Sequence, residues 1–166
     1  MGRCDFMDDG ELFFFGEYTH ALDNQRRVAI PREWRSKGDN DRFILFPGHN
    51  TLMLVPYAAF RDFLAKARKV SLANRQAQEA LARIGAKVQE CLCDKQGRIT
   101  ISQRLLDLLG IKEEIVLVGA FSTIQLWHPD AWAQHRDSDD AYLDEVQKIT
   151  ESPDGLMELL KEFKKE

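Results

Sequence analysis

The sequence predicts an α+β protein made of two similar halves, with connecting helices between them and a helical tail after them. The first observation is a repeated motif, Asp-x-x-x-Arg followed by apolar, small and apolar residues and then by Pro or Ser. It occupies residues 22–31 and again 92–102. The second observation is that the match continues beyond the motif at an offset of 71 (94 − 23 and 98 − 27) or 72 residues. Such a duplication indicates one pseudo-symmetric unit rather than two independent domains.

The first half, residues 13–60, is predicted to run strand, turn, strand, short helix and hairpin. Asp23 and Asn24 favour chain reversal because their side chains accept hydrogen bonds from nearby backbone amides. Pro31 can open a helix, since the first helical position needs no N–H donor. The predicted elements are a strand at 13–22, a turn at 23–26, a strand at 28–30, a helix from 31 to a closing Gly38, and a hairpin formed by 43–46 and 52–55.

Two helices are predicted to connect the halves within residues 61–86, the first of them already opening at Pro56. That helix carries apolar residues at steps of three and four, which is typical of an amphipathic helix. The second runs from Asn74 to Ala86. We expect it to be buried through Ala77, Leu81 and Ile84.

The second half, residues 87–132, repeats the order of the first. Gly110 is predicted to close its helix, because glycine readily takes the left-handed conformation that ends many helices. The predicted elements are a strand at 88–93, a turn at 94–97, a strand at 98–101, a helix at 102–109, a hairpin from 115 to 127 with Gly119 near its turn, and a helix from Pro129 through Trp132.

Acidic segments flank the two halves. We expect a flexible leader at 1–12 and an acidic helical tail at 133–166 with a last helix at 156–163. Residues 137–166 carry ten acids and four bases, a net charge of −6, whereas residues 12–136 carry 18 bases and 13 acids, a net charge of +5. This distribution is compatible with binding of a polyanion by the middle of the chain.

Composition argues against several classes of protein. The sequence has no window of about 18 uncharged apolar residues and no basic start followed by an apolar run, so we expect a soluble protein that is not exported. Its three cysteines, Cys4, Cys91 and Cys93, form an odd set that suits a reducing cytoplasm. Cys91 and Cys93 would face the same side of a strand, but no second Cys or His pair has ligand spacing. We therefore read them as small apolar residues and predict no metal or cofactor.

The two Asp-x-x-x-Arg motifs, together with Gly119-Ala120-Phe121 and Leu126-Trp127, resemble the bacterial MraZ family over roughly residues 14–132. The resemblance implies two βαββ halves with a fold similar to that of AbrB-type swapped-hairpin transcription factors. It implies a non-enzymatic regulator of the operon for cell division and cell-wall synthesis, which binds short direct repeats in double-stranded DNA upstream of its own gene. The implied assembly is a ring-like homo-oligomer, with eight subunits as one candidate number, in the cytoplasm at the nucleoid.

The motif arginines Arg27 and Arg98 are the first candidate DNA contacts, because a guanidinium at a hairpin tip can bind guanine through two hydrogen bonds or contact a phosphate. The resemblance favours that role. Asp23 and Asp94 belong to the same candidate site. Their structural interpretation stays open beside it, namely that each accepts turn amides and pairs with its arginine to fix a hairpin. Further candidate phosphate contacts are Arg26, Arg32, Arg35 and Lys37.

Arg26 departs from the pattern of the family, which usually has glycine before the motif arginine, as at Gly97. A residue other than glycine in a left-handed conformation costs roughly 1–2 kcal/mol. We therefore expect either a differently shaped first turn or a left-handed Asn24. The remaining alternative is that Arg26 itself is strained in a left-handed turn.

Two other functions are weighed against the regulator. A hydrolase would use Asp23, Asp94 and His20 as acid, base or metal ligands. That interpretation is weak, because the sequence has no nucleophile beside a base, no glycine-rich phosphate loop and no ligand pattern among its four histidines. A non-enzymatic scaffold could instead assemble through Phe13–Phe15 and bind a partner through the last predicted helix.

Overall fold

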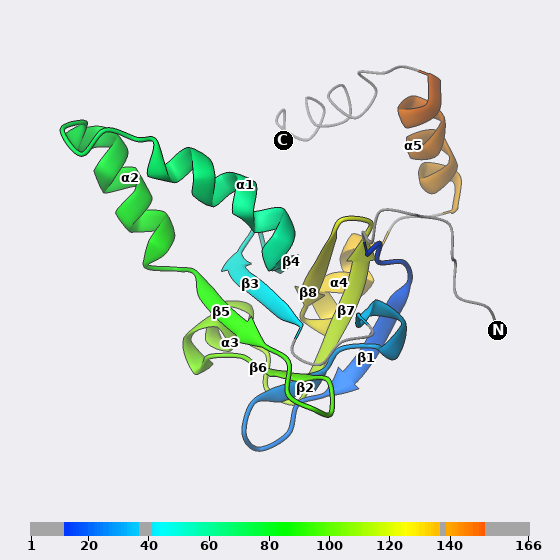
Figure 1. Ribbon diagram of the computed structural model, residues 1–166. Coiled ribbons are helices and arrows are strands. Elements are labelled where there is room, and N and C mark those ends of the chain that lie inside the picture. The colour runs from blue at the N-terminus through cyan, green and yellow to red at the C-terminus, as the bar shows by residue number, and fades with distance from the viewer. Residues whose placement is uncertain (1–11, 37–40, 137–138, 152–166) are drawn as a thin grey trace. The chain divides into compact units, whose positions relative to one another are not determined.

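The computed structural model describes residues 12–36, 41–136 and 139–151 (Figure 1). The chain divides into two compact units, residues 1–131 and 132–166, and each is described by itself. Most of the predicted leader, Lys37, Gly38 and the last predicted helix lie outside the described residues. Among the described helices, none is both long and apolar enough to cross a membrane.

A six-stranded antiparallel sheet dominates the first unit, with the strand order β1-β7-β8-β4-β3-β5, while β2 and β6 form a separate pair. The strands are β1 (Glu17–Ala21), β2 (Arg27–Ala29), β3 (Arg42–Pro47), β4 (Leu52–Pro56), β5 (Gln89–Leu92), β6 (Arg98–Thr100), β7 (Glu114–Ala120) and β8 (Thr123–Trp127). The described helices are η1 (Arg32–Trp34), α1 (Tyr57–Arg68), α2 (Arg75–Gly85), α3 (Gln103–Leu109), α4 (Pro129–His135) and α5 (Asp139–Glu151). The α+β architecture predicted from the sequence is confirmed at the level of a mixed fold of helices and antiparallel strands.

The duplication is visible in how the strands pair across the centre of the unit. In the β4–β8 pair Met53 lies opposite Gln125, and 125 − 53 = 72. In the β2–β6 pair Val28 lies opposite Ile99, and 99 − 28 = 71. Equivalent residues of the two halves therefore face each other at both places, as a two-fold relation between the halves requires.

Each half also contributes its first strand to the sheet of the other half. β1 pairs with β7, and β5 pairs with β3. The two registers are equivalent, since Tyr18 lies opposite Leu117 and Gln89 lies opposite Leu45. The halves consequently share one sheet and one core, and neither can be removed without breaking strand pairs of the other.

The core includes side chains from the sheet, the β2–β6 pair, η1 and α3. Val28 and Ile99 are 1% and 0% exposed, and the equivalent residues Trp34 on η1 and Leu105 on α3 are 2% and 0% exposed. Full burial of side chains of this size stabilises a fold by about 1.5–3 kcal/mol each. Phe14, one of the aromatic residues considered for assembly, is also 0% exposed. Its ring is therefore engaged within its own chain.

The helix expected after Pro31 is shorter than predicted, because η1 is a single 3-10 turn. The next residue, Arg35, is already extended, and the N–H of Ser36 donates to Oδ2 of Asp41 at 2.9 Å. That hydrogen bond directs the chain away from the helix axis. The equivalent helix α3 continues to Leu109 and ends at Gly110, whose φ of 65° is the left-handed cap that the sequence predicted.

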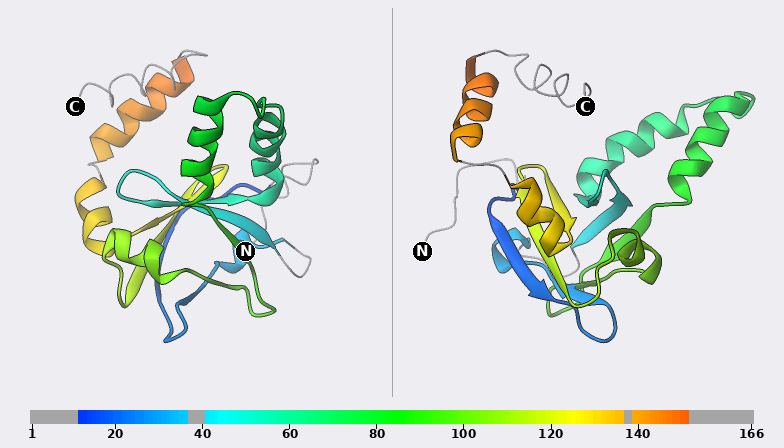
Figure 2. Two further views of the ribbon diagram at one scale, coloured as in Figure 1. Left: turned by 90° about the vertical axis from the view of Figure 1, so that its left-hand side faces the viewer. Right: turned by 180° about the vertical axis from the view of Figure 1, so that it is seen from behind.

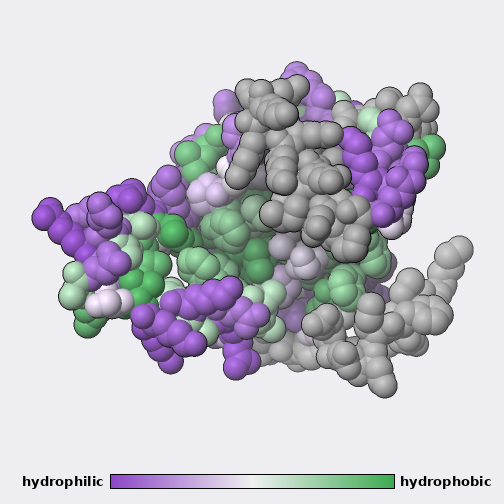
Figure 3. All heavy atoms as spheres, turned by 90° about the horizontal axis from the view of Figure 1, so that it is seen from above, coloured by the Kyte–Doolittle hydropathy of each residue, from purple (hydrophilic) through white to green (hydrophobic). Residues whose placement is uncertain are grey.

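Helices α1 and α2 form an arm that projects from the sheet (Figures 1 and 2). The prediction that α2 is buried is wrong, since α2 has no buried residue and Ile84 is 44% exposed. The apolar spacing identified a helix face correctly, but the chain places no layer over that face. From above, apolar side chains lie exposed among charged ones on the arm, at the left of the view (Figure 3). The exposed large apolar residues there are Phe63, Leu64, Leu72 and Ile84.

Candidate nucleic-acid interface

The first motif turn, residues 23–27, is held by the side chain of Asp23. Its Oδ1 accepts hydrogen bonds from the backbone N–H groups of Gln25 and Arg27, both at 2.9 Å. Its Oδ2 accepts from Nε of Arg27 at 2.6 Å. The backbone closes the same turn, with the N–H of Arg26 donating to the C=O of Asp23 at 3.0 Å. One carboxylate therefore fixes both the turn and the direction of the arginine.

The second motif turn, residues 94–98, repeats these contacts. Oδ1 of Asp94 accepts from the N–H groups of Gln96 and Arg98 at 2.9 Å, and Oδ2 accepts from Nε of Arg98 at 2.9 Å. The hydrogen bond from the Arg98 backbone N–H lowers the pKa of Asp94, and its counterpart from Arg27 lowers the pKa of Asp23. Both carboxylates are therefore charged at neutral pH, and the turn role considered for them is observed.

Arg27 and Arg98 lie on one face of the β2–β6 pair. Val28 and Ile99 between them face the core, and side chains alternate along a strand, so the two arginines point outward. Nη1 of Arg98 lies 4.0 Å from Oδ2 of Asp23, which links the two turns. The arginine side chains are 28% and 29% exposed. Both turns lie at the lower end of the unit in Figures 1 and 2, so this end presents two equivalent guanidinium groups.

Each arginine keeps donors for a ligand. Nε is used by the aspartate, while the two Nη atoms carry four further N–H groups. Among the described residues, the one polar contact of these Nη atoms is that of Arg98 Nη1, which lies 4.0 Å from Oδ2 of Asp23. A guanidinium can donate two parallel hydrogen bonds to a phosphate or to a guanine edge. Because the aspartates already restrict the side chains, binding would cost less conformational entropy.

Arg26 takes the left-handed conformation with φ 59°, as its equivalent Gly97 does with φ 79°. The strained, left-handed Arg26 is thus the alternative that is observed, while the differently shaped turn and the left-handed Asn24 are wrong, because the two turns share one shape and Asn24 is not left-handed. The opposite half fixes the position: the C=O of Arg26 accepts from the N–H of Ile101 at 2.9 Å, as the C=O of Gly97 accepts from Ile30 at 2.8 Å. Nε of Arg26 also donates to the C=O of Ile101 at 3.2 Å.

The other candidate cations are less closely tied to the turns. Arg32 is exposed on η1, and within the described residues no hydrogen bond or ion pair joins its side chain to either turn. Arg35 is half-buried, and its guanidinium covers Gly97, where an added Cβ would lie 2.5 Å from Cζ. Lys37 is outside the described residues. The sequence reasoning missed Lys95, which is exposed in the second motif turn and was recognisable as a cation inside a predicted turn.

Other chemistry finds little support in the described part of the chain. Burial raises the pKa of the Cys91 and Cys93 thiols to about 12, so both are neutral at physiological pH and neither is a reactive thiolate. No group of three His, Cys, Asp or Glu residues there could hold a metal ion. His20 lies on β1 with its ring stacked 6.2 Å from that of Tyr18. The two motif aspartates that a hydrolase would need are engaged in the turns.

Comparison with known proteins agrees with the duplication. A family model described as "MraZ protein, putative antitoxin-like" matches residues 13–83 and again 85–149. The transcriptional regulator MraZ of Clostridium acetobutylicum is 33% identical over 127 residues, which cover 75% of this chain and 88% of that protein. The regulator of the same name from Finegoldia magna is 32% identical over 149 residues, which cover 88% of this chain and 98% of that protein.

Proposed function

Because the chain belongs to the MraZ family, we propose that it is a non-enzymatic transcriptional regulator that binds double-stranded DNA through its two motif turns. The observation that carries the proposal is the pair of guanidinium groups of Arg27 and Arg98 on one face of the β2–β6 pair, each held by its own aspartate. The names of the relatives, which describe transcriptional regulators, support the same conclusion.

The residues divide into three roles in this proposal. Arg27 and Arg98 contact base edges, since a two-stranded ribbon can enter the major groove and a guanidinium can pair with guanine there. Asp23 and Asp94 hold the arginines in place. The other cations, which are Arg26, Arg32, Arg35, Lys37 and Lys95, contact phosphates, which supplies affinity without sequence preference.

The finer parts of the proposal concern fold, assembly and target. The exchange of β1 and β5 between the halves supports a swapped-hairpin arrangement of the AbrB type. We further propose a ring-like homo-oligomer in the cytoplasm, associated with the nucleoid, whose subunits bind short direct repeats upstream of the division and cell-wall operon. Linked subunits would multiply a weak contact into a strong one through effective concentration.

The experiment is a mobility-shift titration of the DNA upstream of the protein's own gene. An arginine–guanine contact is worth about 1–3 kcal/mol, so Arg27→Ala and Arg98→Ala should each weaken specific binding by about 5- to 150-fold per subunit. Arg75→Ala is the matched control, because Arg75 is 89% exposed on α2 and makes only a surface ion pair with Glu79.

Two outcomes would contradict the proposal. Normal shifts with both motif variants would make the arginines purely structural residues. Light scattering tests the assembly separately, since the ring predicts a particle several times heavier than the 19.1 kDa chain. A monomer at micromolar concentration would remove the ring and the effect of linked subunits while leaving the base contacts to be judged by the titration.

A further inference from the structure

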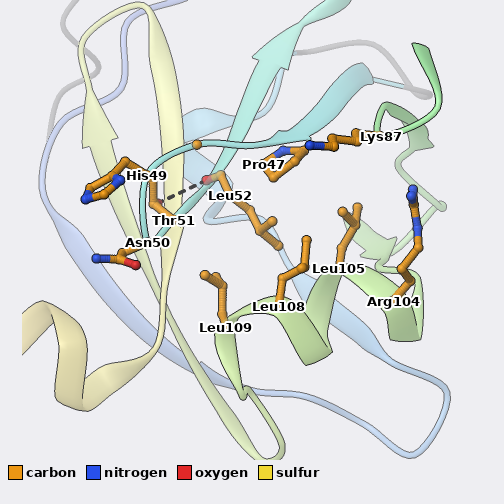
Figure 4. Close-up of a pocket in the computed structure, with 11 residues that line it drawn as sticks. Pro47, His49, Asn50, Thr51, Leu52, Lys87, Arg104, Leu105, Leu108 and Leu109 are labelled. Atoms are coloured by element: carbon orange, nitrogen blue, oxygen red, sulfur yellow. Dashed lines mark hydrogen bonds between the residues drawn. The ribbon is translucent and has the colours of Figure 1, made fainter. Parts of the chain in front are cut away.

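A slot with a volume of about 410 Å³ opens between the β3–β4 turn of the first half and α3 of the second half (Figure 4). We call it the Leu108 slot. Leu105 and Leu108 point from α3 toward the turn, and Leu108 is 61% exposed. Lys87 and Arg104 lie at one end of the slot. Its described lining includes no acidic residue.

The equivalent place, between the β7–β8 turn and η1, is filled by the segment before β1. Phe14 is 0% exposed there, and its ring meets Trp34 edge-on with ring centroids 5.9 Å apart. The N–H and C=O of Phe14 form hydrogen bonds with the C=O and N–H of Phe121 at 2.8 and 3.1 Å. The backbone packs directly against the strand, since a Cβ on Gly119 would lie 2.5 Å from the carbonyl carbon of Phe14.

The second half has no side chain to do the same. The residue equivalent to Phe14 is Gly85, because 14 + 71 = 85, and it ends α2. The residue equivalent to Trp34 is Leu105, which is smaller than the indole. Two aromatic groups of the first half are thus replaced by one leucine and one glycine, and the Leu108 slot is the space that results.

Within the described residues, no strand covers the edge beside the slot. Gly119 donates its N–H to the C=O of Gly16 at 2.8 Å, whereas the equivalent residue Pro47 has no N–H and cannot pair with an added strand, so pairing is confined to the residues beyond it. β5 begins only at Gln89, so it does not run to the tip of the β3–β4 turn as the β1 segment runs to Phe121. Within the described residues, the backbone N–H and C=O of His49, the counterpart of Phe121, make no backbone hydrogen bond.

We propose that the Leu108 slot binds an extended segment of a partner protein, with an aromatic residue flanked by acidic residues. The segment would form backbone hydrogen bonds with His49, beyond Pro47, as added strands do in peptide recognition, and place its aromatic ring on the exposed Leu108. The volume lies in the range of about 300–1,000 Å³ that is usual for binding pockets. This site uses none of the motif arginines, so it stands apart from DNA binding.

The positive charge at the slot is the reason for proposing acidic residues on either side of the aromatic residue in the partner segment. Lys87 and Arg104 are exposed, and Nη1 of Arg104 is oriented by a 2.9 Å hydrogen bond to the C=O of Ala86. Their equivalents in the first half are Gly16 and Glu33, so the positive charge is specific to the unfilled slot. Complementary charge speeds the approach of a partner and disfavours basic segments.

The test uses a fluorescent peptide with the sequence of residues 8–17, Asp-Asp-Gly-Glu-Leu-Phe-Phe-Phe-Gly-Glu, because it contains the segment that fills the first slot. Anisotropy with the full chain should show saturable binding that weakens with salt. Leu108→Asp should weaken it at least about tenfold, as should replacing the central Phe of the peptide with Ala. Leu143→Asp is the matched control, since Leu143 is also a 61% exposed helical leucine, and it should leave binding unchanged.

Three outcomes would overturn the proposal. No binding to the unmodified chain would show that the slot does not recognise such a segment. Equal binding to the chain with Leu108→Asp would place the peptide elsewhere, for example in the first slot by displacement of Phe14. A change in particle mass with Leu108→Asp, measured by light scattering, would show that a second copy of this chain occupies the slot instead of a partner protein.

Discussion

The two motif turns share the same hydrogen bonds but differ at the residue before the arginine. Arg26 and Gly97 both have positive φ, 59° and 79°. Glycine takes this conformation freely, whereas arginine pays roughly 1–2 kcal/mol for it. The turn therefore does not depend on glycine. It is imposed by the aspartate at its start and by the strand of the opposite half, which binds the carbonyl of the left-handed residue.

The turns also differ in where their additional guanidinium comes from. In the first turn Arg26 supplies it and extends Nε to the C=O of Ile101. In the second turn Arg35 on the far side of η1 lies over Gly97, in the space that a side chain there would need. A substitution at the same position should consequently have different effects in the two turns.

The largest expected effect is that of Gly97→Ala. The new Cβ is strained at φ 79° and overlaps the Arg35 guanidinium, so we expect the free energy of unfolding to fall by about 2 kcal/mol or more. Two control substitutions separate the backbone strain from the overlap with Arg35. Gly110→Ala meets no atom within 4 Å but keeps φ 65°, and should cost about 1 kcal/mol. Gly85→Ala has neither problem and should be neutral or slightly stabilising.

Urea denaturation at one fixed protein concentration measures all three glycine variants, because any assembly would otherwise change the apparent stability. The loss in free energy of unfolding should be largest for Gly97→Ala, smaller for Gly110→Ala and smallest for Gly85→Ala. If Gly97→Ala were no worse than Gly110→Ala, the Arg35 side chain would be free to move away, and the close approach would carry no energetic weight.

An intermediate effect is expected at Arg26. Arg26→Ala keeps the backbone strain and loses the hydrogen bond to Ile101, so stability should fall by about 0.5–1.5 kcal/mol. Arg26→Gly loses the same bond but relieves the strain. It should therefore be more stable than Arg26→Ala by up to about 1 kcal/mol, the reverse of the usual order for glycine and alanine. Melting curves show which of the two variants is more stable. A higher melting temperature for Arg26→Ala than for Arg26→Gly would contradict a strained Arg26.

A salt titration of DNA binding with Arg26→Gly tests the phosphate role of the same residue. Each phosphate contact contributes about 0.9 to the slope of log affinity against log salt. A decrease of that size in the slope would support a phosphate contact by Arg26. An unchanged slope would mean that the Arg26 side chain serves the hydrogen bond to Ile101 and does not contact DNA.

The sequence predicted well what depends on local chemistry. Asp23 and Asp94 mark their turns because an aspartate accepts amides two and four residues onward, and Gly110 marks a helix end through its own backbone freedom. The 71-residue repeat made the second half predictable from the first. For the same reason, the face shared by Arg27 and Arg98 follows from the alternation around Val28 and Ile99.

What the sequence could not supply depends on distant parts of the chain. A left-handed Arg26 was one of several alternatives, and local preferences could not decide among them, because Ile101 of the other half holds the carbonyl of Arg26. Helix η1 ends early because Ser36 is bound by Asp41. The apolar face of α2 was recognised, but periodicity identifies a face that favours burial, not the layer that would cover it. The Leu108 slot appears only when Gly85 and Phe14 are compared in space.

The smallest expected effect is a pH dependence that both turns should share. The turn hydrogen bonds lower the pKa of Asp23 and Asp94 below 3.8, so the stabilisation from each carboxylate is fully present above that value and is lost as pH falls through the lower, folded-state pKa. Asp23→Asn and Asp94→Asn keep an oxygen that can accept the turn amides, but they remove the charge and replace the oxygen that accepts from the arginine Nε with an NH2 donor. Their deficit in melting temperature should therefore be constant from about pH 7 to pH 5 and shrink toward about pH 3.

The two asparagine variants should differ slightly, which sharpens the comparison of the turns. Asp23 contacts Nε of Arg27 at 2.6 Å and also lies 4.0 Å from Nη1 of Arg98, whereas Asp94 forms an ion pair with Arg98 alone among the residues that the structure describes. Asp23→Asn should therefore cause the larger deficit. Added salt should reduce both, because the two carboxylates are 32% and 37% exposed and surface ion pairs are screened. A deficit that is independent of both pH and salt would show that amide geometry, and not the charge, holds these turns.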